Sequence, residues 1–100
     1  MESRLLRPID LERYQTIGNQ QNNDNPIVIN RFITLRKNYT WYATEFNPHT
    51  WMFFWYIRSD YSEWWYFSLY DLENIVLKNW VVIMRDQFYE PKVFSEALLW

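Results

Sequence analysis

The chain has 100 residues, no cysteine and one glycine, and its 10 basic and 12 acidic side chains give a formal net charge of −2. The absence of cysteine excludes disulfides, thiolate metal sites and cysteine nucleophiles. One glycine excludes the phosphate-binding and dinucleotide-binding loops that need several. The mild negative charge argues against a surface built to neutralise phosphates. We expect a single domain over residues 1–100, dominated by aromatic side chains at 22% of the chain.

The N-terminal residues, MESRLLRP, contain charges and no apolar run, so no secretory signal is expected. The longest apolar run, residues 51–57, is shorter than the roughly 20 residues that a bilayer-spanning helix needs. These observations predict a cytoplasmic protein with no membrane partner.

A short helix is predicted within residues 1–17. Pro8 suits the first helical position, because the backbone N–H at that position has no partner within a helix and proline has no N–H to leave unpaired. Asp10 favours the positive end of the helix dipole. Apolar side chains then recur at helical spacing, which predicts a packing face. They are Leu11, Tyr14 and Ile17.

The stretch from Gly18 to Pro26, GNQQNNDNP, is predicted to be a loop, because a run of polar amides does not bury itself. A solvated connector is one interpretation. A loop that becomes ordered on a partner is the other.

Four runs of strand-forming residues follow, separated by short polar breaks, and they predict a hairpin-connected antiparallel sheet. The predicted strands are 27–35, 39–47, 50–58 and 63–69. Ser68 is expected to cap a helix, with Asp71 three residues later and Leu72, Ile75 and Val76 as its apolar stripe.

Residues 80–84, WVVIM, predict a buried fifth strand, and residues 93–99 predict a final helical turn or two. The expected fold class is therefore α+β. It combines a four- to five-stranded, mostly antiparallel sheet with an N-terminal helix and a helix after the fourth strand.

Aromatic residues occupy both alternating faces of the strands at 50–58 and 63–69, whereas an antiparallel sheet with one solvated face shows polar residues there. Either the chain covers both faces itself, or one face is left for a partner or for a second copy of the chain. We predict a partner-binding surface with a charged rim. Its residues are Trp51, Trp55, Trp64 and Tyr66, with Asp60 and Glu63 as the rim.

No pattern of catalytic or metal-ligating residues is evident, and His49, the one histidine, follows Pro48 in a predicted turn. We expect a binding module and not an enzyme, with no catalytic residues, no cofactor and no metal. One alternative is a nucleic-acid-binding protein with Arg31, Arg36, Lys37 and Arg58 as phosphate contacts. Another is a carboxylate-based or metal-dependent hydrolase that uses Glu45 with Asp60 and Glu63.

Nearly the whole chain resembles, in order, the family of small proteins known as domain of unknown function 2958. The centre of the resemblance is TWYATEF at 40–46. The other matching segments are Leu5-Leu6 with the helix that follows, NPIV at 25–28, RFIT at 31–34, the aromatic run at 53–57, YFSLYDLE at 66–73 and RDQFYEPKVFSE at 85–96. The chain departs from the family in having aromatics at 54–56 and 64–65 where glycines are expected, and in a loop at 18–25 richer in Asn and Gln.

The resemblance implies the kind of genome that encodes the protein, but it implies no reaction. Members of the family look like cargo of plasmids, conjugative elements and phages, often encoded near anti-restriction genes, and no catalytic residues carry over from them. The resemblance therefore implies a protein of the bacterial cytoplasm that binds another protein. An inhibitor of a host defence system, directed against CRISPR or restriction, is the function that we expect from this setting. Nucleic acid is not the expected partner.

Overall fold

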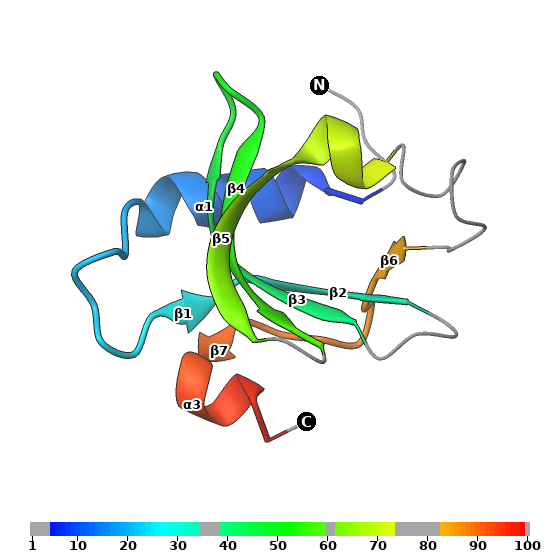
Figure 1. The fold of residues 1–100 in the computed structure, drawn as a ribbon. Coiled ribbons are helices and arrows are strands. Elements are labelled where there is room, and N and C mark those ends of the chain that lie inside the picture. Colours follow the sequence, from blue (N-terminus) through cyan, green and yellow to red (C-terminus); the bar gives the residue numbers. More distant parts are fainter. Residues whose placement is uncertain (1–4, 35–38, 60–61, 74–82, 100) are drawn as a thin grey trace.

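The computed structural model describes residues 5–34, 39–59, 62–73 and 83–99 (Figure 1). It confirms the α+β class: an N-terminal helix, a five-stranded antiparallel sheet, and helical segments later in the chain. The elements are α1 (Pro8–Ile17), β1 (Ile27–Val28), β2 (Asn30–Thr34), β3 (Thr40–Asn47), β4 (Met52–Arg58), β5 (Glu63–Ser68), β6 (Ile83–Arg85), β7 (Lys92–Val93) and α3 (Phe94–Ala97). A further helical segment spans residues 69–73.

The main sheet has the strand order β5-β4-β3-β2-β6, and it curves strongly between β5 and β6 (Figure 1). The single strand predicted at 27–35 is wrong, because the chain divides at Ile29. Residues 27 and 28 pair with β7 in a separate two-stranded sheet, while β2 pairs with β3 and β6. Ile29 itself donates its N–H to the carbonyl of Ala43 at 2.8 Å.

Helix α1 starts as the sequence predicts, with Pro8 at its beginning. Asp10 is completely buried and accepts the backbone N–H of Arg7 at 2.8 Å, a contact that satisfies a free donor at the helix start. It also accepts the Arg7 side chain and, at 3.1 Å, the amide of Asn30 on β2. Burial acts to raise the pKa of Asp10, but these hydrogen bonds outweigh it and hold the pKa below its ordinary value. A single carboxylate thus begins α1 and ties it to the sheet.

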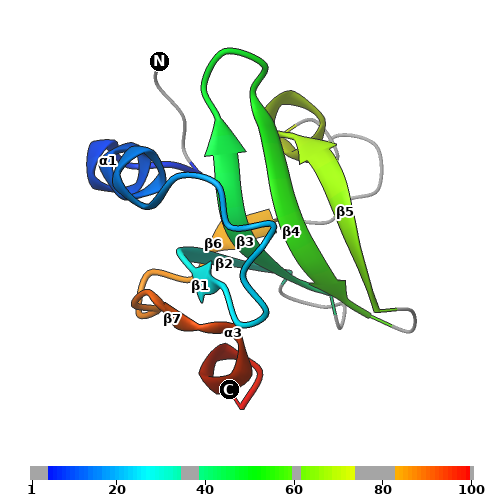
Figure 2. The ribbon, with the colours of Figure 1, turned by 90° about the vertical axis from the view of Figure 1, so that its left-hand side faces the viewer.

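The sheet has two different faces, which Figure 2 shows from the side. The inner face carries Phe53 and Trp55 of β4, and α1 packs over it together with residues 5, 6, 69 and 72. The outer face carries Tyr42 and Tyr56, and the C-terminal elements cover part of it: Tyr89, Phe94 and Ala97 pack there. The chain therefore covers much of both faces with its own elements.

A β-bulge in β3 decides which side chains reach which face. Ala43 lies opposite Trp55, and Glu45 lies opposite the adjacent β4 residue, Phe54. Thr44 is therefore an extra residue in β3 with no opposite residue in β4. A bulge of this kind reverses the alternation beyond it. Glu45 consequently lies on the outer face, and Phe46 is buried against Phe53 on the inner face.

The strand predicted at 50–58 begins later, at Met52. Trp51 belongs to the hairpin before it and has a positive φ of 60°, a conformation that favours glycine. Its N–H bonds to the carbonyl of Asn47 at 2.7 Å, and its carbonyl accepts the N–H of Leu69 at 2.8 Å. These contacts hold the hairpin against the segment that follows β5.

The Ser68 cap is confirmed, since its hydroxyl accepts the N–H of Asp71 at 2.9 Å. Ile75, Val76 and residues 80–82 lie outside the described residues, so the predicted fifth strand is seen only from Ile83 onward.

Candidate binding groove on the outer face

The pairing between β2 and β3 ends before β3 does. Strand β2 pairs with residues 40–43 of β3, and the last residues of β3 extend past it. A strand edge of this kind leaves main-chain groups without a partner, which buried backbone does not tolerate. The loop after α1 supplies the missing partner.

Gln20 is the residue that supplies it. Its side chain is 6% exposed, and its Nε2 donates to the carbonyls of Thr44 and Ile27, each at 2.8 Å. Its Oε1 accepts the N–H of Ile27 at 2.6 Å. The prediction that the polar loop does not bury itself is therefore wrong at Gln20, because this amide replaces the hydrogen bonds of a neighbouring strand.

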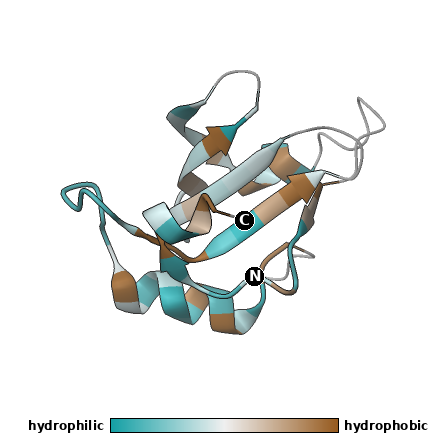
Figure 3. Cartoon of the chain, turned by 90° about the horizontal axis from the view of Figure 1, so that it is seen from below, coloured by the Kyte–Doolittle hydropathy of each residue, from teal (hydrophilic) through white to brown (hydrophobic). Residues whose placement is uncertain are grey.

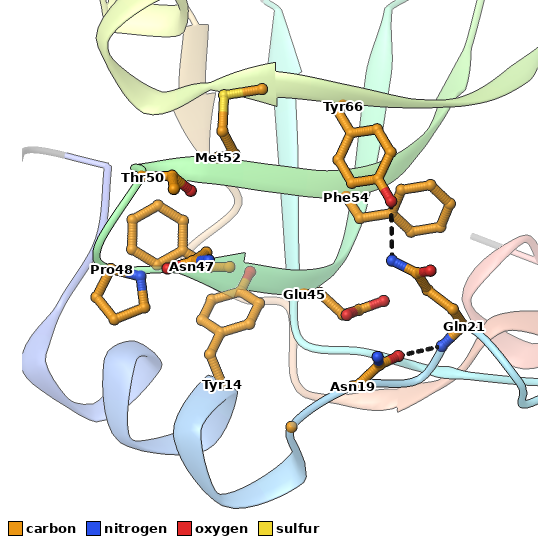
Figure 4. Close-up of a pocket in the computed structure, with 12 residues that line it drawn as sticks. Tyr14, Asn19, Gln21, Glu45, Asn47, Pro48, Thr50, Met52, Phe54 and Tyr66 are labelled. Atoms are coloured by element: carbon orange, nitrogen blue, oxygen red, sulfur yellow. Dashed lines mark hydrogen bonds between the residues drawn. The ribbon is translucent and has the colours of Figure 1, made fainter.

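The anchored loop forms one wall of an open pocket of about 460 Å³. Figure 4 shows this pocket between the C-terminal part of α1, the β3–β4 hairpin and β5. Residues from six parts of the chain line it, among them Tyr14, Gln21, Glu45, Thr50, Phe54 and Tyr66.

The loop crosses the sheet surface at Gln21. Its amide donates to the hydroxyl of Tyr66 at 2.9 Å, and its N–H bonds to the side chain of Asn19 at 2.8 Å (Figure 4). A second pocket of about 330 Å³ continues on the other side of this crossing, with Asp24 and Trp64 in its wall. Gln21 and Phe54 border both pockets. We call the two pockets together the outer groove.

Aromatic rings form the floor of the outer groove. Phe54 stacks on Trp64, with ring centroids 5.4 Å apart and planes 11° from parallel, and it contacts Tyr66 at 4.9 Å. The row continues under the C-terminal helix, where Phe94 packs against Trp64 and Tyr56, each at 4.9 Å. Helix α3 thus covers one end of a continuous aromatic row and leaves the other end to the groove.

Two polar groups in the first pocket have an unpaired atom. The Oε2 atom of Glu45 and the hydroxyl of Tyr14 are buried without a hydrogen-bond partner among the described residues. Desolvation raises the pKa of Glu45, with a smaller opposing contribution from the Gln20 backbone. Burial raises the pKa of Tyr14 well above its ordinary value. The described residues lining the two pockets include no Lys, Arg or His, so nothing in the walls neutralises Glu45 or Asp24.

A family model described as "Protein of unknown function (DUF2958)" matches residues 5–96. The chain belongs to the DUF2958 family. The matched range contains every residue of the outer groove named above, from Tyr14 to Tyr66. No curated protein and no solved structure matches the chain. In the described part of this DUF2958 member, no helix is long and apolar enough to cross a membrane.

The structure separates the residues that the sequence groups as a partner-binding surface. Trp64 and Tyr66 border the outer groove. Trp55 is 0% exposed on the inner face, so the prediction that it contacts a partner is wrong. Alternation along β4 puts Trp55 on the α1 side, while Trp64 lies opposite Tyr56 on the outer face.

The other predicted surface residues lie away from the groove. Trp51 is 39% exposed in the β3–β4 hairpin but does not line either pocket. Glu63 is exposed at the start of β5, opposite Ile57, and alternation puts it on the inner-face side. Asp60 lies outside the described residues.

The same geometry bears on the two alternatives. Glu45 and Glu63 lie on opposite faces of the sheet, so they do not form the carboxylate pair that the hydrolase alternative needs. Among the described residues no cluster of three or more His, Cys, Asp or Glu side chains could hold a metal.

Of the proposed phosphate contacts, Arg31 pairs with Asp86 and lies over the ring of Tyr89. Arg58 donates to the carbonyl of Leu98 at 3.0 Å. Arg36 and Lys37 lie outside the described residues. Both described arginines therefore already have partners within the chain.

Sequence reasoning misses Tyr14, Gln20, Gln21 and Phe54 as parts of the site. One signal in the sequence does point to the bulge. Trp41 and Ala43 alternate as a strand requires, but the next apolar residue is Phe46, three positions later. This change of spacing indicates an inserted residue and places Glu45 on the outer face. No comparable signal marks Gln20, whose partners lie 7 and 24 residues away along the chain.

Proposed function

We propose that this DUF2958 protein is a protein-binding module, and that the outer groove is its binding surface. The observation that carries the proposal is the aromatic floor of Phe54, Trp64 and Tyr66, left partly open beside a polar wall. A few residues carry most of the binding energy at protein interfaces, and tryptophan and tyrosine are enriched among them. The wall is held in place by the buried amide of Gln20, which lowers the cost of ordering the loop on binding.

The charges of the groove support a protein partner over nucleic acid. Glu45 and Asp24 lie in its walls, and the described wall residues include no basic side chain. A surface that binds phosphates needs the opposite sign.

The resemblance to proteins of mobile elements supports a finer proposal about the partner. We propose that the module inhibits a host defence system, of the CRISPR or restriction type, by docking on one of its proteins. The support here is the resemblance to genes that are often encoded near anti-restriction genes, which is an association and not a feature of the site.

The proposal is tested by affinity capture from a bacterial host lysate with the tagged protein, with and without nuclease treatment. Tyr66→Ala removes a ring that is 48% exposed in the groove. Tyr70→Ala is the matched control, since Tyr70 is 65% exposed but lines neither pocket.

We expect one protein to be retained after nuclease treatment. Tyr66→Ala is expected to weaken its binding by about 2 kcal/mol, roughly 30-fold, and Tyr70→Ala to leave it unchanged. Capture that depends on nucleic acid would contradict the proposal, as would equal binding by both variants, with folding of each checked by circular dichroism.

A further inference from the structure

The first pocket of the outer groove contains acceptor atoms that the fold does not use. The hydroxyl of Tyr14 belongs to a side chain that is only 4% exposed, and it has no hydrogen-bond partner among the described residues. Figure 4 shows it directed toward the end of β3. The Oε2 atom of Glu45 also lacks a partner in the described part of the chain. Buried polar atoms in folded proteins nearly always have partners, so these two indicate a ligand.

The walls of this pocket indicate the charge of that ligand. Glu45 is the one ionisable carboxylate among its described lining residues, and none of them is basic. The remaining polar groups are amides and hydroxyls, among them Asn19 and Asn47, whose side-chain oxygens each already accept one backbone N–H, and the hydroxyl of Thr50. A carboxylate with no basic side chain among the described lining residues attracts a cation that donates several hydrogen bonds.

The aromatic rings beside Glu45 favour one kind of cation. Phe54 and Tyr66 lie 4.9 Å apart on the floor of the pocket, and the β3 bulge places Glu45 directly opposite Phe54 in the strand pairing. A planar guanidinium group stacks on aromatic rings and forms two parallel hydrogen bonds with a carboxylate, while an ammonium group is more strongly hydrated and does neither as well.

We propose that this pocket receives an arginine side chain of the partner protein, stacked on Phe54 and Tyr66 and paired with Glu45. The inference rests on the proposed protein-binding function and assigns the chemistry that the groove recognises. An arginine with aromatic and carboxylate partners is a typical centre of a protein interface.

The test is an NMR titration of the ¹⁵N-labelled protein at constant ionic strength. The probes are N-acetyl-argininamide, its lysine counterpart, and N-acetyl-citrullinamide, which has the shape of the arginine probe without its charge. A single side chain is expected to bind weakly, with a Kd of roughly 1 to 30 mM. We expect the arginine probe to shift the amides of Gln21, Glu45 and Tyr66 and to bind at least about fivefold more tightly than the other two.

Variants test whether the shifts come from this pocket. Glu45→Gln keeps the shape of the side chain and removes its charge, and it is expected to weaken the arginine probe at least about tenfold. Glu63→Gln is the matched control, because it makes the same change at an exposed site on the opposite face, and it is expected to have no effect. No shifts at roughly 0.1 M probe, equal binding of the three probes, or equal effects of the two Glu→Gln variants would each overturn the inference.

This experiment and the affinity capture can fail separately. If a protein is captured and Tyr66→Ala releases it, but the arginine probe does not bind, the module binds proteins by another contact. If the arginine probe binds at Glu45 while no protein is captured, the pocket is assigned correctly and the protein-binding function is not.

Discussion

The inner and outer faces of the sheet each carry a pair of stacked rings at similar spacing, but the two pairs differ in how far they are buried. On the inner face Phe53 and Trp55 stack at 5.0 Å, and both are 0% exposed. On the outer face Phe54 and Trp64 stack at 5.4 Å, and both are half-buried. The first pair stacks along one strand, β4, and the second joins β4 and β5, so both arrangements follow from the sheet itself. Burial depends on what packs over it: α1 on one side, and on the other α3, which reaches only part of the row.

The largest expected changes in stability come from making the same substitution on both faces. Trp55→Ala leaves a cavity under α1 and is expected to lower the free energy of unfolding by about 4 kcal/mol. Trp64→Ala removes a half-buried ring and is expected to cost about 2 kcal/mol, because solvent already reaches part of it. Chemical denaturation of both variants measures the difference. Equal losses would mean that the outer face is as much a core as the inner one.

Two neighbouring glutamines test the wall of the groove. Gln20→Ala leaves buried main-chain groups of Ile27 and Thr44 without partners, and we expect a loss of about 2 to 3 kcal/mol. Gln21→Ala removes an exposed hydrogen bond to Tyr66 and is expected to cost about 0.5 kcal/mol or less. Denaturation curves give both values. A Gln20 variant as stable as the Gln21 variant would contradict the anchoring role of Gln20.

Two tyrosines, one packed on each face, test whether the unpaired hydroxyl belongs to the fold. Tyr14→Phe keeps the ring against Phe46 and Phe53 and removes a hydroxyl without a partner among the described residues, so stability should change by less than about 0.5 kcal/mol. Tyr89→Phe removes a buried hydrogen bond to the carbonyl of Val28 at 2.9 Å and should cost about 1 kcal/mol. If Tyr14→Phe is the more damaging change in thermal denaturation, its hydroxyl has a structural partner.

The smallest expected effect is at Glu45 and is recognised by its dependence on pH. The folded protein raises the pKa of Glu45 above its ordinary value of 4.5, so the folded state binds this proton more tightly than the unfolded state. The contribution of Glu45 to the free energy of unfolding is therefore highest at acid pH. It falls as the pH rises from about 4.5 through the higher pKa of the folded state. Relative to the wild type, Glu45→Gln should gain stability from pH 4 to pH 7. Thermal melts across this range measure the gain, and a constant difference between the two proteins would contradict it.

The parts of the fold that depend on local patterns follow from the sequence. Pro8 and Asp10 at the start of α1, the Ser68 cap, and the strand-forming runs of β3, β4 and β5 are all local, and the structure confirms them. The pairing of β1 with the C-terminal β7 joins residues more than 60 positions apart, and no local pattern contains it.

The candidate site depends more on long-range contacts than the fold does. Trp55 and Trp64 are indistinguishable in sequence, because their faces follow from the register between β4 and β5 and from where α1 packs. Glu45 joins the groove only through the Thr44 bulge. Gln20 is one amide in a run of similar residues, and its burial depends on β2 ending before β3.

The way in which the loop is fastened also affects how freely its sequence can vary. Gln20 and Pro26 are buried, whereas the five residues between them, 21–25, are all exposed, and Gln21, Asn23 and Asp24 border the groove. Exposed loop positions tolerate substitution at little cost in stability, while the proposed binding depends on those that border the groove. Gln20, Pro26 and the hydrogen bonds between Asn25 and Ser95 fix the loop, and residues 21–24 form the segment that can vary. Other chains built on this plan could keep the fixed residues and bind different partners.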